Sequence, residues 1–159
     1  MEDVRTPFEI GDERRTLVAF LDYLRDAIVR KTEGLDEGEL RRSPVRSGTS
    51  LLGLVKHLTY VEAVWFQYSF AGSDAHPPSG DLEDGDTGDS VIGAYRQAIE
   101  VSNEIVAAAG DLDRLAARPA AVAEPMSLRW ILVHMVEETG RHAGHADILR
   151  ELIDGQIGR

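Results

Sequence analysis

The chain contains no cysteine among its 159 residues. It can therefore form no disulfide and no thiolate metal site, and any metal must be held by histidine, carboxylate or water ligands. Such ligands suit zinc, nickel, cobalt, manganese or iron. A reaction that needs a thiol would have to take that thiol from another molecule.

Basic residues are also scarce, because 17 Lys and Arg stand against 28 Asp and Glu, which gives a net charge of −11. This balance argues against a partner that is nucleic acid or an anionic membrane surface. No apolar run approaches the roughly 20 residues of a membrane-spanning helix. The first 12 residues are polar and acidic, so the sequence predicts no signal peptide, and we expect a cytoplasmic protein.

Four segments repeat apolar residues at helical spacing, and none alternates in the manner of a strand. Serine, threonine or aspartate can cap these segments, and glycine lies just beyond each of them. The predicted helices span residues 12–33, 50–71, 89–109 and 127–154, with Asp89 as the expected cap of the third.

The length of the chain fits one domain, 1–159, and four helices of about 20 residues predict an all-α fold, a four-helix bundle. The connections 73–88 and 111–126 are long, so we expect one or two of them to cross over along the bundle. The first is rich in aspartate and is predicted to be mobile, and the second is predicted to hold at most one short helical turn.

The last predicted helix carries ionisable side chains where a helix should bury apolar ones. At about 100° of turn per residue, one narrow sector holds ionisable groups bounded by apolar ones: Ile131, His134, Glu138, His142, His145 and Leu149. Arg150 falls on another face. Burying a carboxylate and imidazoles costs several kcal/mol unless they are paired, hydrogen-bonded or bound to a metal. Glu138 and His142 lie one turn apart, so both can reach a single ion.

His57 is the one histidine in the first three predicted helices, and it shares its face with apolar residues. Together with Glu138 and His142 it would form a three-ligand site with an open position, as in catalytic metal centres. Two alternatives stay open. His57 by itself could be a hydrogen-bonded core residue, and Glu138 could be a core carboxylate paired to Arg141 or Arg129.

Two further histidines lie in the same sector. His145, three residues after His142, is a candidate fourth ligand or a proton carrier, and it is our candidate catalytic residue. His134, one turn before Glu138, is a candidate partner for a ligand or a pocket-lining residue. For each of them, an ordinary core histidine is the alternative interpretation.

The second and fourth predicted helices carry a recognisable pattern. They read SLLGLVKHLTYVEAVW over 50–65, SLRWILVH over 127–134 and EETGRHAGHADILRE over 137–151. Together these segments resemble the DinB/YfiT-like metalloenzyme superfamily, and most of all its actinobacterial-type branch, which includes mycothiol-dependent enzymes. The resemblance covers essentially the whole chain.

The resemblance implies a four-helix bundle, often dimeric, that holds a divalent metal, commonly zinc or nickel. Many members carry a His-x-x-x-His pair on the last helix, whereas this chain has Glu138 four residues before His142. A Glu-x-x-x-His pair also occurs in the mycothiol-dependent maleylpyruvate isomerase type. Many relatives have Gln at the position of His145. The isomerase type has a further C-terminal domain and this sequence ends at Arg159, so we do not expect that particular isomerisation.

Members of known chemistry activate a low-molecular-weight thiol. The resemblance therefore implies a metal-dependent S-transferase that joins mycothiol, bacillithiol or glutathione to an electrophilic small molecule. Its metal, zinc first and nickel second, would be held by His57, Glu138 and His142. A metal-dependent hydrolase and a non-catalytic stress protein that binds a metal or ligand are the alternatives. We also expect a homodimer, both from the resemblance and from the wide apolar surface of helix 50–71, where Phe66 is predicted to lie opposite His57.

Overall fold

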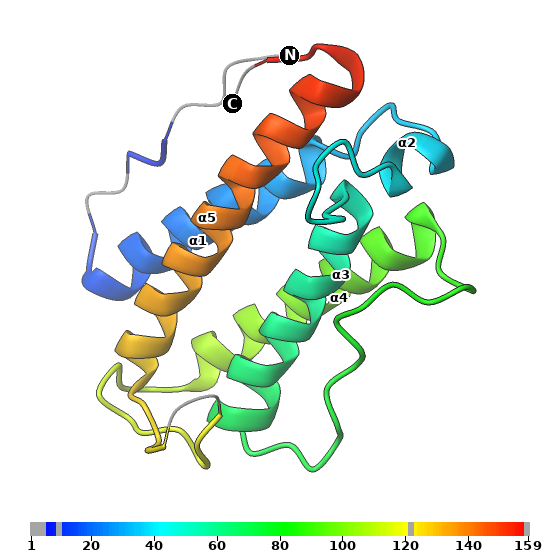
Figure 1. Ribbon diagram of the computed structural model, residues 1–159. Coiled ribbons are helices and arrows are strands. Elements are labelled where there is room, and N and C mark those ends of the chain that lie inside the picture. The colour runs from blue at the N-terminus through cyan, green and yellow to red at the C-terminus, as the bar shows by residue number, and fades with distance from the viewer. Residues whose placement is uncertain (1–5, 9–10, 121–122, 158–159) are drawn as a thin grey trace.

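The computed structural model describes residues 6–8, 11–120 and 123–157, and its long helices form a bundle (Figure 1). The ends of the predicted domain 1–159, and two residues of the connection 111–126, lie outside the described residues. In chain order the helices are α1 (Glu13–Arg30), α2 (Glu37–Arg41), α3 (Leu51–Glu62), the π-helix η1 (Ala63–Phe70), α4 (Gly88–Ala108) and α5 (Leu128–Asp154). The predicted all-α four-helix bundle is confirmed.

The long helices pack in two pairs, α1 with α5 and α3 with α4, and α3 also contacts α5. The connection between η1 and α4 returns along the length of the bundle, so α3 and α4 run in the same direction (Figure 1). This is the predicted crossover. One cluster of buried apolar side chains includes Phe66 and Met135, and a second includes Leu58 and Tyr95. None of the helices that the structure describes is both long and apolar enough to cross a membrane.

Most helix ends follow the signals in the sequence. The side chains of Asp12, Ser50 and Ser127 each accept a hydrogen bond from the backbone N–H three residues further on. A cap of this kind stabilises a helix by about 1 kcal/mol. Gly155 has a φ of 78° and ends α5 in the left-handed conformation that favours glycine. The predicted cap of α4 was wrong by two residues, because Thr87 and not Asp89 caps that helix.

The short helix α2 was not predicted. It lies in the connection between α1 and α3, where a capping box makes one extra turn stable. Asp36 accepts a hydrogen bond from the Glu39 backbone, and the Glu39 side chain accepts one from the Asp36 backbone. This reciprocal pair satisfies two backbone donors that would otherwise face solvent.

The π-helical end of the second long helix was also not predicted. The Ala71 N–H donates to the carbonyl of Phe66, five residues earlier, at 2.9 Å. Because a π-helix turns less per residue than an α-helix, a reading at α-helical spacing misplaces its side chains. Phe66 is fully buried in the core, so it contributes nothing to the apolar surface that was predicted around it, and the dimer itself stays a prediction.

Arg25 and Glu62 form an ion pair inside the bundle, where α3 passes into η1. The Arg25 Nε donates to one Glu62 oxygen at 2.8 Å and Nη2 donates to the other at 2.7 Å. Neither side chain is more than 1% exposed. Burial by itself would lower the pKa of Arg25, but Glu62 and Asp22 raise it above its ordinary value. The pair fastens α3 to α1.

Arg150 is buried, although the helical reading placed it away from the inward stripe. Its Nη1 donates to the carbonyl oxygens of Lys31 at 3.0 Å and Glu33 at 2.7 Å, just past the end of α1. The last carbonyls of a helix lack partners within the helix and carry partial negative charge, so a guanidinium is stabilised there. Helical spacing alone did not indicate this burial, because the partners of Arg150 come from a distant part of the chain.

Polar contacts hold the crossing connection against α2 and α3. The Asp86 carboxylate accepts hydrogen bonds from Lys56 Nζ at 2.7 and 2.8 Å. The Arg41 guanidinium donates to the Asp86 carbonyl, and the Gly88 N–H donates to Glu37 at 2.8 Å. These contacts fix the connection beside α3, the helix that carries His57.

Candidate metal centre

Three side chains of metal-ligand type meet between α3 and α5. His57 projects from α3, and Glu138 and His142 project from successive turns of α5. The Nε2 atom of His57 lies 3.2 Å from Oε1 of Glu138, and that of His142 lies 3.1 Å from the same oxygen. One ligand atom from each residue lies within 4.8 Å of the others. The structure therefore brings together the three residues that the sequence predicted as ligands.

This ligand cluster fits a divalent cation. Metal–ligand bonds of about 2.0–2.2 Å place neighbouring ligand atoms roughly 3–3.5 Å apart, close to the two separations just given. Two imidazoles and one carboxylate suit zinc and nickel, and three protein ligands leave a position open for water or substrate. The cluster thus has the donor set and the spacing to hold one ion.

The directions of the pKa shifts of Glu138 and His142 also suit a metal. Burial by itself would raise the pKa of the Glu138 carboxyl, but the hydrogen bond with His57 and the charges of His142 and Arg141 bring it below its ordinary value. Burial lowers the pKa of His142 and outweighs the opposing effect of Glu138. A carboxylate and a neutral imidazole are the forms that bind metals.

Glu138 also has the arginine partner considered from the sequence. The Arg141 guanidinium donates to Oε2 of Glu138, while Oε1 faces the two histidines. Arg129, the other arginine considered, pairs with Glu13 and Asp113 instead. Oε2 of Glu138 therefore forms the ion pair with Arg141, and Oε1 remains available to a metal ion.

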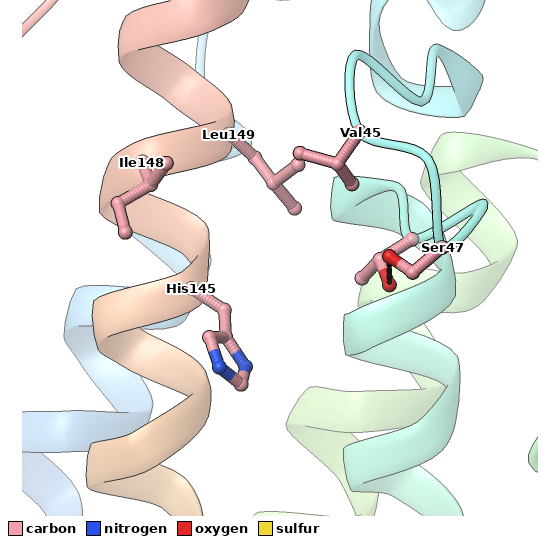
Figure 2. A pocket seen from close by; sticks show the side chains of 6 residues that line it. Val45, Ser47, His145, Ile148 and Leu149 are labelled. Carbon is pink, nitrogen blue, oxygen red and sulfur yellow. Dashed lines mark hydrogen bonds between the residues drawn. The ribbon is translucent and has the colours of Figure 1, made fainter.

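Two adjoining cavities open beside the cluster. We call the larger one, about 410 Å³, the polar chamber; besides His57 and His142 it is lined by Ser47, Gly48, Thr49, Ser50, Gly53, Leu54, Gly80, Asp81 and Leu82. We call the smaller one, about 270 Å³, the apolar chamber; it is lined by Val45, Ser47, Thr49, His145, Ile148 and Leu149 (Figure 2). The chambers share Ser47 and Thr49, and small-molecule sites have volumes of this order.

A family model described as mycothiol-S-transferase matches residues 16–155. The chain belongs to the mycothiol-S-transferase family. The match runs from α1 to α5 and contains all three residues of the ligand cluster. It confirms the resemblance to the mycothiol branch of the DinB/YfiT-like proteins. No curated protein matches the chain significantly.

In this mycothiol-S-transferase family member, His145 lies next to the ligand cluster. Its Nδ1 is 3.4 Å from Nδ1 of His142, and its ring is exposed in the wall of the apolar chamber. The side chain projects into the space between α5 and the segment before α3 (Figure 2). This position suits the predicted proton carrier, and the role itself stays a prediction.

His134 contacts aromatic rings. Its ring centre is 4.7 Å from that of Trp65 and 5.1 Å from that of Trp130, and the two tryptophan rings contact each other at 5.4 Å. Its Nδ1 is 3.8 Å from the Glu137 carboxylate. Within the described residues the ligand cluster comprises His57, Glu138 and His142, so His134 belongs to a separate aromatic group, one turn before Glu138 on α5.

The chamber-lining segments 45–50 and 80–82 were not predicted. A signal existed for the first, because residues 47–50 directly precede α3, whose second turn carries His57. They had to lie at the same end of that helix as the histidine. No comparable signal existed for 80–82, because its place beside α3 depends on the long-range contact between Lys56 and Asp86.

Proposed function

We propose that this chain is a metal-dependent enzyme that transfers a low-molecular-weight thiol, in the first place mycothiol, to an electrophilic small molecule. The observation that carries the proposal is the meeting of two imidazoles and a carboxylate beside the polar chamber, in a member of the mycothiol-S-transferase family. His57, Glu138 and His142 would hold the metal, with zinc as the first candidate and nickel as the second. Bacillithiol and glutathione are the alternative thiols.

A bound divalent cation would lower the pKa of a coordinated thiol and so make thiolate available near neutral pH. The chain itself provides orientation and proton handling. Arg141 holds one oxygen of Glu138 and so directs the other toward the histidines. The hydroxyls of Ser47 and Thr49 offer donors and acceptors to a polar thiol in the polar chamber. His145 is placed to take up the proton that the thiol releases.

A cobalt-substituted protein tests the proposal directly. Added mycothiol should change the visible spectrum, because thiolate-to-metal charge transfer requires direct ligation of the sulfur. Transfer of the thiol to an electrophile should then depend on the metal. If mycothiol, bacillithiol and glutathione all leave the cobalt spectrum unchanged, the transferase proposal is wrong. Turnover without thiol would favour a hydrolase, and metal binding without turnover would favour a binding protein.

Replacement of Glu138 by Gln should weaken metal binding and leave the bundle folded. The amide preserves the shape of the side chain but removes the negative charge that neutralises the cation. We expect zinc affinity to fall on the order of 10- to 100-fold in a competition titration. Glu137→Gln is the matched control, since this neighbouring carboxylate is largely exposed and lies outside the cluster. Equal zinc affinities of the two variants would exclude Glu138 as a ligand.

We further propose a homodimer that works in the cytoplasm, where a reducing environment keeps small thiols reduced. The dimer is expected from the family resemblance. Light scattering at micromolar concentration should give twice the chain mass of 17.5 kDa. A mass equal to that of one chain would contradict the dimer without touching the metal centre.

A further inference from the structure

We propose that the apolar chamber binds the non-reacting part of an uncharged, apolar electrophile, and that electrophiles of this class are the preferred acceptors of the thiol. The inference rests on the proposed thiol transfer and names the substrate class for the same site. Its basis is the chemistry of the chamber walls, their position relative to the ligand cluster, and the charges around both chambers.

The walls of the apolar chamber come from two elements that lie far apart in the sequence. Val45 belongs to the segment before α3, and Ile148 and Leu149 belong to α5. The buried Leu149 side chain points toward Val45, and His145 lies one turn before it (Figure 2). Aliphatic walls of this kind favour an apolar group, and each methylene that is fully buried raises affinity about fourfold.

The two chambers would divide the substrates between them. The polar chamber reaches His57 and His142, so a thiol whose sulfur lies at the ligand cluster would place its polar remainder there. The apolar chamber meets the polar one at Ser47 and Thr49, and His145 stands in its wall. An acceptor whose apolar part lies in the apolar chamber would therefore present its reacting carbon at the junction, beside the sulfur.

The charges around the chambers disfavour an anionic acceptor. No lysine or arginine is among the described residues that line the two chambers, and the one charged carboxylate in the lining, Asp81, is negative. The chain as a whole carries a net charge of −11. A carboxylate among Val45, Ile148 and Leu149 would meet no lysine or arginine in the lining, and the loss of its hydration is costly in apolar surroundings.

N-alkylmaleimides are suitable probes, because their reacting group stays constant while the apolar part grows. The thiol sulfur forms a bond to one carbon of the ring C=C, the π electron pair moves to the other carbon, and that carbon takes the proton released by the thiol. One product forms and nothing leaves. The chain has no cysteine, so it offers no thiol of its own to the probe.

The experiment compares N-methyl-, N-ethyl- and N-butylmaleimide with mycothiol and the zinc-loaded protein, after subtraction of the uncatalysed rate. We expect kcat/KM to rise roughly threefold for each added methylene. 4-Maleimidobutyric acid, which carries a carboxylate on a short chain, should react at least about 10-fold less efficiently than the N-butyl compound. Rates independent of chain length, or an anionic probe as good as the neutral one, would overturn the inference.

Variants at Val45 link the effect to the chamber. Val45→Thr keeps the volume and adds a hydroxyl, and it should lower kcat/KM for N-butylmaleimide roughly three- to tenfold more than kcat/KM for the N-methyl compound. Val45→Phe should fill the space and abolish the gain with chain length. Val133→Thr is the matched control, an exposed valine of α5 that does not line either chamber. If Val45→Thr behaves like Val133→Thr, the chamber does not select the electrophile.

A binding measurement separates this inference from the proposed function. N-butylsuccinimide has the shape of the maleimide but cannot react, and it should shift the methyl NMR signals of Val45 and Leu149 and leave that of Val133 in place. If the shifts appear and no thiol is transferred, the proposed function is wrong, but the apolar chamber still binds uncharged, apolar molecules. If thiol is transferred and no shift or chain-length effect appears, the inference alone is wrong.

Discussion

Replacement of Arg25 by Ala should lower the free energy of unfolding by about 3–5 kcal/mol, measured by urea titration. The variant leaves Glu62 fully buried with its two hydrogen bonds from the guanidinium removed. An unpaired buried carboxylate is far costlier than a lost surface contact. Because a domain is stable by only about 5–15 kcal/mol, this single change should remove a large part of the stability.

Arg129 provides the matched control, because it also pairs with carboxylates but at the surface. Its partners Glu13 and Asp113 are exposed, so Arg129→Ala should change the urea midpoint little. The double variant Arg25→Met, Glu62→Leu should recover most of the stability lost in Arg25→Ala, since it leaves no unpaired buried charge, and Asp22, the other carboxylate bonded to Arg25, is 39% exposed. If Arg25→Ala lowers the free energy of unfolding as little as Arg129→Ala does, then water reaches Glu62 in the variant.

The ion pair also matters for the metal centre. Glu62 lies a little more than one turn after His57 on α3. Its ion pair with Arg25 fastens this part of α3 to α1. On its other side α3 contacts α5, which carries Glu138 and His142. A ligand site formed by two helices needs both helices fixed, and the buried pair holds one of them.

Helix positions could be predicted because they depend on neighbours in the sequence. Ser50 and Ser127 cap the helices they precede, and Gly155 ends the last one, through contacts that span a few residues. The inward direction of His57 and of the Glu138–His142 pair followed from α-helical spacing in the same way. The approach of these side chains to within hydrogen-bonding distance follows from the packing of α3 against α5.

Features that depend on distant partners could not be predicted. The π-helix changes the turn per residue, and so the reading placed Phe66 at the surface when it lies in the core. Arg25 and Arg150 are charged residues that become buried because their partners come from distant parts of the chain. The apolar chamber likewise needs Val45 and Leu149, which are far apart in the chain, to meet.

Removal of a histidine from the ligand cluster should have the largest functional effect. His57→Ala and His142→Ala each delete one of three ligand atoms that lie within 4.8 Å of one another. Loss of a partner outside the ligand shell already weakens metal affinity by about 10- to 100-fold, so loss of a ligand should weaken it by at least about 100-fold. Elemental analysis of protein purified without an affinity tag should then show little metal in either variant.

His76→Ala is the matched control, because His76 is an exposed histidine of the crossing connection and lies outside the cluster. His76→Ala should bind as much metal as the wild-type protein. The helical signal in the far-UV circular dichroism spectrum should be the same in all three variants. Full metal occupancy in both His57→Ala and His142→Ala would show that the cluster is not the metal site. Loss in His142→Ala alone would restrict the site to α5. Loss in both variants, with the fold intact, would require one ion held between α3 and α5, since no single helix could account for it.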